Sequence, residues 1–229
     1  MSYNTTWPDA PEDPVVDDGN WAGGAQVGVV WGDCKSVSGS PNKLQASAFI
    51  AADSDDAIAI RTDDFNAVQS VKAVAFRDAG YAPSFTHEFV MCLRCTLVAN
   101  NCTMYELNYG VQSDLYQLAR WNGTFGDVTV LTKLIDPGTF VLADQDEIEL
   151  SITSGHLISL KANTVLIDQW DGTEGTTLTS GKPGLGFFIR PGAGQDVARA
   201  CWQTVTVDGQ SAPEVQVRPI RVVSSPLRW

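Results

Sequence analysis

The sequence Asp144-Gln-Asp-Glu-Ile-Glu-Leu-Ser-Ile-Thr-Ser-Gly155 runs on through His156-Leu-Ile-Ser-Leu-Lys-Ala-Asn-Thr-Val-Leu-Ile-Asp168 and is followed by Gly181-Lys-Pro-Gly-Leu-Gly-Phe-Phe188. Apolar residues alternate with polar ones in the first two segments, and this period of two is typical of strands with one buried face. Gly, Asn and Asp lie between the runs and favour tight turns. This stretch therefore predicts antiparallel strands joined by short turns.

The same pattern recurs along most of the chain, whereas helical periodicity is almost absent. Further predicted strands cover residues 71–76, 88–95, 104–109, 115–121, 128–134, 201–207 and 215–223. Many short strands separated by Gly, Pro, Asn and Asp indicate an all-β protein with an antiparallel two-sheet jelly-roll sandwich.

Composition excludes several classes of function. The 229 residues are 44% hydrophobic and carry a net charge of −12, which repels phosphate groups, so we expect no nucleic-acid partner. The longest apolar runs are far shorter than the roughly 18 residues that span a bilayer, and an acidic surface disfavours anionic lipid, so we also expect no membrane partner. The first residues resemble no secretory signal peptide. Five cysteines without such a signal favour buried free thiols.

The chain divides by composition into one domain with two arms. Residues 1–19 are acidic and rich in proline, which predicts an extended N-terminal arm, and residues 20–212 form the predicted jelly-roll domain. Residues 213–229 form a predicted C-terminal strand and tail. The tail is either frayed or docks on a partner, since Arg and Trp are enriched in interfaces. Its candidate assembly residues are Arg218, Arg221, Arg228 and Trp229.

The order of segments from Asp144 to Phe188 resembles the concanavalin A-like, laminin-G-like jelly roll. The shared features are an acidic turn, paired strands and the run Gly181-Lys-Pro-Gly-Leu-Gly-Phe. The chain departs from the pattern at Asn163-Thr164, where the family often has Asn-Gly. The resemblance covers roughly residues 20–210 and implies lectins, carbohydrate-binding modules, polysaccharide hydrolases or lyases, and phage structural proteins. A shared fold does not choose among these functions.

A glycan-binding face is one possible site. Sugar rings present C–H faces to aromatic side chains and hydroxyls to planar polar groups. Polar and aromatic residues on successive predicted strands could line a concave sheet in this way, and Trp could equally fill the core. The candidate residues are Arg94, Glu106, Asn108, Gln117 and Trp121.

A catalytic site is less well supported by the residues. Glu147 and Glu149 share a strand face and could act as the two carboxylates of a glycosidase. The related hydrolases carry Glu-x-Asp-x-Glu on the catalytic strand, and the third acid is replaced here by Ser151. We therefore interpret the pair as solvated, and we expect that the protein is not an enzyme. His87 and His156 lie in no recognisable lyase motif.

Metal and redox sites are also weakly indicated. Cys92 and Cys95 are three residues apart, so on a regular strand they face opposite sides and cannot share a zinc ion without a bulge. Cys95 and Cys102 could form a disulfide across a hairpin under oxidising conditions. The acidic loops lack a complete calcium ligand pattern. We expect no metal and no cofactor.

These observations favour a noncatalytic structural or adhesive protein at the surface of a virion or another particle, such as a phage capsid decoration, fibre or baseplate component. Its partners would be protein subunits, including copies of itself, and surface glycans. The alternative is a glycan-binding module or lectin. A second alternative is a polysaccharide hydrolase or lyase that uses Glu147 and Glu149.

Overall fold

A computed structural model describes residues 2–7, 10–25, 31–47, 56–77, 87–111, 113–124, 126–131, 140–173, 175–189 and 200–210. The described chain consists of β-strands and turns, and no α-helix occurs in it. None of its segments is a helix that is long and apolar enough to cross a membrane. The prediction of an all-β fold is therefore confirmed.

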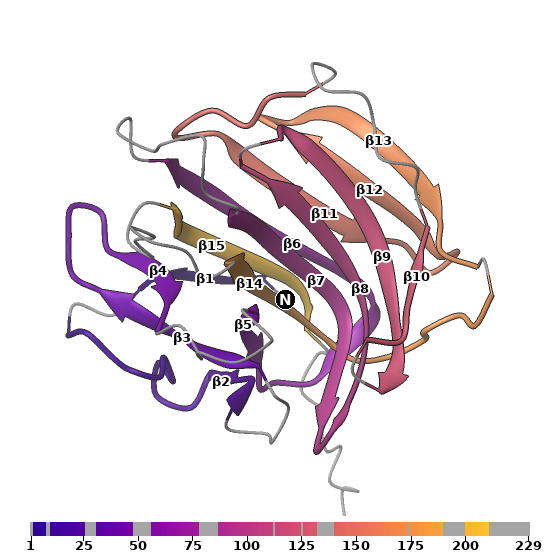
Figure 1. Ribbon diagram of the computed structural model, residues 1–229, viewed down its shortest axis with the longest axis horizontal. Helices are drawn as coiled ribbons and strands as arrows, with labels where there is room; N and C mark the ends of the chain where they lie inside the picture. Colours follow the sequence, from indigo (N-terminus) through magenta and orange to yellow (C-terminus); the bar gives the residue numbers. More distant parts are fainter. Residues whose placement is uncertain are drawn as a thin grey trace, which may run out of the picture.

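The strands form two layers joined into one curled sheet (Figure 1). Sheet A contains β4 (Lys43–Ala46), β15 (Ala200–Gln210), β6 (Phe65–Arg77), β11 (Glu147–Ile152), β12 (Leu157–Ala162) and β13 (Val165–Asp171), and β1 (Ser2–Thr6) also pairs with β15. Sheet B contains β10 (Val128–Val130), β9 (Leu115–Thr124), β8 (Asn101–Gly110), β7 (His87–Val98), β14 (Lys182–Ile189) and β5 (Asp56–Arg61), and β2 (Trp21–Gly23) also pairs with β5.

One strand connects the two layers. β3 (Gly32–Val37) pairs in parallel with β5 of sheet B through its first residues and antiparallel with β4 of sheet A through its last. In Figure 1, β2, β3 and β4 lie together at one end of the molecule, away from β9, β10 and β13. The antiparallel two-sheet jelly roll is confirmed, with β3 and β5 as a parallel pair.

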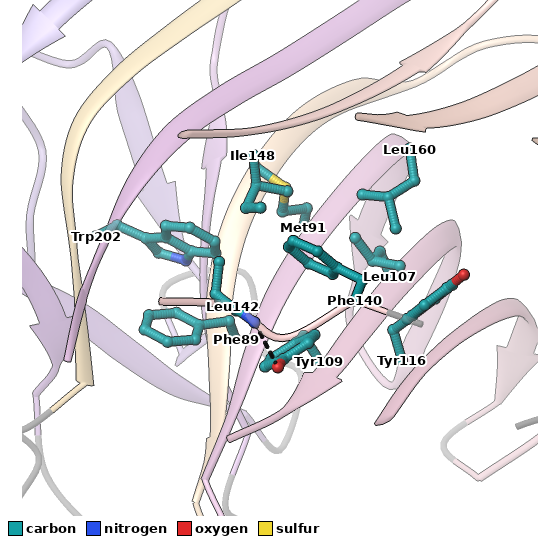
Figure 2. Close-up of a pocket in the computed structure, with 10 residues that line it drawn as sticks. All are labelled: Phe89, Met91, Leu107, Tyr109, Tyr116, Phe140, Leu142, Ile148, Leu160 and Trp202. Carbon is teal, nitrogen blue, oxygen red and sulfur yellow. Dashed lines mark hydrogen bonds between the residues drawn. The ribbon is translucent and has the colours of Figure 1, made fainter. Parts of the chain in front are cut away.

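The core lies between the sheets because alternate side chains of each strand point inward. In β11 the buried positions are Ile148, Leu150 and Ile152, as the sequence alternation predicts. Figure 2 shows the middle of this core, where large apolar side chains of both sheets converge on a cavity of about 10 Å³. The backbone N–H of Leu142 donates to the Tyr109 hydroxyl at 2.7 Å in its wall. An apolar space of this size is a packing gap and too small for a ligand.

The acidic N-terminal stretch is not an extended arm, contrary to our expectation. β1 pairs with β15 over five residues, and the side chains of Trp7 and Val15 are completely buried in the core. The Glu12 carboxylate accepts hydrogen bonds from the backbone N–H groups of Val16 and Asp17. Apolar burial and strand pairing thus hold this segment in the sandwich despite its charge.

The turn at Asn163-Thr164 joins β12 to β13 in spite of the missing glycine. Both residues have positive φ angles, 47° and 70°. Positive φ at both central residues is the primed geometry that matches the twist of a hairpin. The Asn163 side chain stabilises the turn, because its carbonyl accepts from the Glu147 N–H and its amide donates to Asp146.

Candidate functional site

The outer face of sheet B carries the best candidate site. In β7, β8, β9 and β14, the residues that alternate with the core-facing residues point away from sheet A. Cross-strand register places them in rows. One row contains Gly184, Cys92, Glu106 and Ala119, and the next contains Gly186, Val90, Asn108 and Gln117.

Part of this outer face is covered by a second apolar cluster. Its buried members are Trp31, Ile58, Ile60, Cys92, Cys95, Leu97, Cys102, Met104 and Trp121. The rings of Trp31 and Trp121 meet edge to face, with centroids 5.0 Å apart. Trp121 is therefore a packed residue and not an open stacking surface, because only 7% of it is exposed.

Glu106 lies beneath this cover and has an unusual environment for a carboxylate. The residue is 4% exposed, and its Oε2 atom accepts from the indole N–H of Trp121 at 2.5 Å. The Asn108 amide donates more weakly to the same oxygen at 3.4 Å. Burial, which disfavours the charged form, raises the pKa of Glu106 to about 7, and the negative charge of Glu88 adds to the effect.

The partly exposed residues of this face form a patch next to the second cluster. Glu88, Phe188, Asn108 and Gln117 belong to it, and we call this set the polar patch. Phe188 pairs with Glu88 in register, and Asn108 pairs with Gln117. The patch combines an accessible ring with amide and carboxylate groups, which is the chemistry that sugar recognition requires.

Four of the five residues that the sequence suggested for glycan binding share this face. They are Glu106, Asn108, Gln117 and Trp121. Sequence reasoning missed Glu88 and Phe188. Phe188 could have been predicted from the pair Phe187-Phe188. If Phe187 is buried in the core, the next residue of the strand must face the other side.

Arg94 is not part of the face, and that prediction is wrong. A β-bulge lies between Leu93 and Thr96, and Arg94 has a φ of 50°. The fully buried guanidinium points toward sheet A, where it donates to the backbone carbonyls of Ala67, Thr153 and Leu178 and contacts His156 Nδ1. Arg94 therefore fastens β7 to the end of sheet A. The bulge is the physical reason, because it reverses the side that the residue faces.

The same bulge overturns our argument about the cysteines. It brings Cys92 and Cys95 to one face, where Cys95 interacts through hydrogen bonds with both Cys92 and Cys102. All five cysteines are buried free thiols, Cys95 and Cys102 included, so the candidate disulfide is not formed in this structure. Burial raises the pKa of the Cys95 thiol, which disfavours a reactive thiolate.

Metal ligation finds no support in the described part of the chain, where no group of three His, Cys, Asp or Glu residues could hold an ion. His87 is buried at the start of β7, and His156 contacts Arg94. One of the acidic loops is Asp53-Ser-Asp-Asp56, and its residues 53–55 lie outside the described residues, as do Arg218, Arg221, Arg228 and Trp229.

Glu147 and Glu149 lie on the other side of the molecule, on the outer face of sheet A. Lys72 Nζ is 3.2 Å from Glu147, and Lys161 Nζ is 3.1 Å from Glu149. Each carboxylate is about one third exposed and has a lysine partner on a neighbouring strand. These are surface ion pairs, as the reading of a solvated face predicts.

Comparison with known proteins supports the fold. No family model matches the chain, and no curated protein matches its sequence significantly. A Bacillus subtilis protein of unknown function with a galectin-like fold is similar in structure (TM-score 0.55, 13% identity, 91% of this chain and 94% of that chain). A Bacteroides ovatus mixed-linkage glucan GH16 protein in complex with a G4G4G3G product gives a TM-score of 0.53 (9% identity, 90% and 98%). The carbohydrate-binding module CBM66 from Bacillus subtilis gives 0.51 (11% identity, 83% and 93%).

These likenesses, together with the strand order, define the class. The chain has a concanavalin A-like jelly-roll fold of the kind found in lectins and carbohydrate-binding modules. At such low identity the similarity concerns the fold alone, so function has to be argued from the residues of the outer face.

Proposed function

We propose that the protein is a noncatalytic carbohydrate-binding protein and that the polar patch of sheet B is its binding site. The observation that carries this proposal is the row-by-row arrangement of Phe188 beside Glu88 and of Asn108 beside Gln117 on one accessible face. The ring offers a stacking surface, and the amides and the carboxylate offer hydrogen bonds to hydroxyls.

The buried layer beside the patch supports a binding role. Glu106 accepts hydrogen bonds from the Trp121 indole and, more weakly, from the Asn108 amide, which restrains the Asn108 side chain. Recognition by few groups requires such fixed neighbours, because ordering a mobile side chain costs free energy on binding.

Binding without hydrolysis agrees with the placement of the carboxylates. A glycosidase needs two carboxyl groups that flank one bond and reach the substrate. Glu106 is almost fully buried. Glu88 lies two rows away from Glu106, because it pairs with Gly110 of β8. Glu147 and Glu149 are engaged with lysines on the opposite side.

A glycan array followed by calorimetry on the purified chain tests the proposal. We expect binding that weakens at least tenfold in Phe188→Ala and in Asn108→Ala/Gln117→Ala, while unfolding midpoints stay close to the native value. The matched control is Ser151→Ala on the outer face of sheet A, which should bind normally. Absence of binding to every glycan would refute the proposal. Polysaccharide turnover that disappears in Glu88→Gln or Glu106→Gln would refute its noncatalytic part.

A role in a larger assembly, such as a virion surface, is a second proposal. It is supported by β10 at the edge of sheet B, which pairs only with β9 among the described residues and exposes 37% of Val128 and 51% of Val130. Exposed apolar edges are sites of association. Light scattering should then detect oligomers of the native chain that Val128→Lys/Val130→Lys dissociates, and a monomer at all concentrations would argue against self-association.

A further inference from the structure

A pocket of about 210 Å³ borders the second cluster on the outer face of sheet B, at the opposite end of β14 from the polar patch. Residues of β2, β5, β7 and β14 line it, among them Ala22, Ile60, Thr62, Cys95, Leu97 and Lys182. The pocket is far larger than the roughly 30 Å³ that one water occupies, and it is smaller than the roughly 300–1,000 Å³ of pockets for drug-sized ligands. It therefore has room for a small molecule.

Strand register and two irregularities build the pocket. Ala22 pairs with Ile60 across β2 and β5, and Lys182 pairs with Cys95 across β14 and β7. Both β7 and β14 shift register at this point, so two bulges lie beside each other. Bulges re-aim side chains and are common next to binding sites.

The inner wall of the pocket is apolar and uncharged. Ile60, Cys95 and Leu97 are buried members of the second cluster, and Ala22 packs against them. Burial raises the pKa of the Cys95 thiol, so this side chain stays neutral and acts as a small apolar group. Such a wall favours a ligand whose body is apolar, because contact with it removes apolar surface from water.

Lys182 gives the pocket a single available positive charge. The half-buried side chain donates from Nζ to the backbone carbonyl of Thr62, and an ammonium group has two further hydrogens to donate. Within the described part of the chain no carboxylate pairs with Lys182, whereas Lys72 and Lys161 each pair with a glutamate. None of the described lining residues is acidic.

Arg61 also borders the pocket but supplies no second charge to a ligand. Its guanidinium pairs with Asp63, and its Cζ atom lies 3.5 Å from the centroid of the Tyr3 ring. A lone ammonium beside an apolar wall is complementary to a single negative charge on an apolar body.

We propose that this pocket binds a small carboxylic acid with a compact apolar body. The carboxylate accepts hydrogen bonds from Lys182, and the body packs against Ile60 and Leu97. Phe188 of the polar patch lies six residues beyond Lys182 on β14, which is about 20 Å along a strand. The pocket is therefore a separate site, and the inference does not rest on glycan binding.

Titration of the full chain with cyclohexanecarboxylate, followed by methyl NMR, tests the proposal. We expect saturable shifts of the Ile60 and Leu97 methyl signals. Cyclohexanemethanol, which has the same body without the charge, should bind at least tenfold more weakly. Glucuronate should also bind at least tenfold more weakly, because its hydroxyls would lose hydration against the apolar wall. Absence of saturable shifts, or equal affinity for the alcohol or for glucuronate, would overturn the proposal.

Two variants of the full chain separate the charge from the space. Lys182→Met should weaken binding of the carboxylate at least tenfold and leave the weak binding of the alcohol unchanged, whereas Ala22→Phe should fill the pocket and abolish both. The matched control is Lys72→Met on the outer face of sheet A, which should bind normally, as should Phe188→Ala in the polar patch. Unchanged carboxylate affinity in a Lys182→Met protein with a native unfolding midpoint would overturn the proposal.

Discussion

The outer faces of the two sheets differ although both sheets line one core. On sheet A the outer positions of β11 are half-buried polar residues, and Glu147 and Glu149 pair with lysines. On sheet B the second cluster covers part of the outer face, and the carboxylate of Glu106 is buried beside it. One outer face is thus a solvated surface, and the other carries a second packed layer next to the polar patch.

This difference shows where the structure can hold a fixed set of polar groups. A solvated side chain is mobile and gains little from its partners, whereas a buried one is restrained by packing and hydrogen bonds. The polar patch lies beside the packed layer, so its amides have rigid neighbours. If the second layer restrains the patch in this way, substitutions within it should cost more stability than substitutions on the outer face of sheet A.

The largest effect is expected from Arg94→Met, which removes the hydrogen bonds that the Arg94 guanidinium makes between β7 and the end of sheet A. The substitution leaves the backbone carbonyls of Ala67, Thr153 and Leu178, which lie in a partly buried site, without their donor. Since an unsatisfied buried group costs about 1–3 kcal/mol and these carbonyls are only partly buried, we expect a loss of about 3–4 kcal/mol in the free energy of unfolding. Urea denaturation measures it, and a loss below about 1 kcal/mol would show that Arg94 is a solvated side chain after all.

The next effect is expected from Trp31→Ala, which uncovers the second layer. Trp31 is 2% exposed and packs against Trp121. Removal of a buried tryptophan typically costs about 3–5 kcal/mol, and we expect a value near the lower limit because the site borders solvent. Thermal and urea unfolding test this, with Val130→Ala at the exposed edge as the control. Equal stability of both variants would mean that the second cluster contributes little to the free energy of unfolding.

Sequence reasoning succeeded on sheet A and partly failed on sheet B for the same physical reason. In β11 one face is buried, so alternation alone identifies the buried side. In β7 and β8 both faces are buried over several residues, and alternation then carries no information about which side is the core. The rows that contain Glu106, Asn108 and Gln117 were nevertheless found, because these residues are polar in otherwise apolar strands. Arg94 was misplaced, since a single residue with positive φ leaves no clear signal in a strand.

The acidic N-terminal segment illustrates a second limit. Its composition resembles an arm, yet Trp7 and Val15 are completely buried. Two apolar anchors and strand pairing with β15 outweigh the charge of the intervening residues. Composition averages over a segment and therefore cannot reveal such isolated anchors.

A pH-dependent effect of intermediate size is expected at Glu106. Its pKa is raised from 4.5 to about 7 in the folded protein. The folded state therefore binds more protons than the unfolded state between these values, so its stability falls as pH rises through this range. The full shift corresponds to about 3 kcal/mol. Glu106→Gln should remove this slope while keeping an acceptor for Trp121, and urea midpoints of both proteins from pH 4 to 8 measure the difference. Parallel pH profiles would show that the carboxylate is solvated.

The smallest effect is expected from Glu147→Gln and Glu149→Gln on the outer face of sheet A. Each substitution removes one partner of a partly exposed ion pair with Lys72 or Lys161. Such pairs contribute about 0–1 kcal/mol, so we expect changes below about 0.5 kcal/mol, which shrink further in high salt. Urea unfolding at low and high salt measures them. A loss of several kcal/mol, or a loss of glycan binding, would mean that this face is also a fixed polar layer, and the contrast between the two outer faces would no longer locate the binding site.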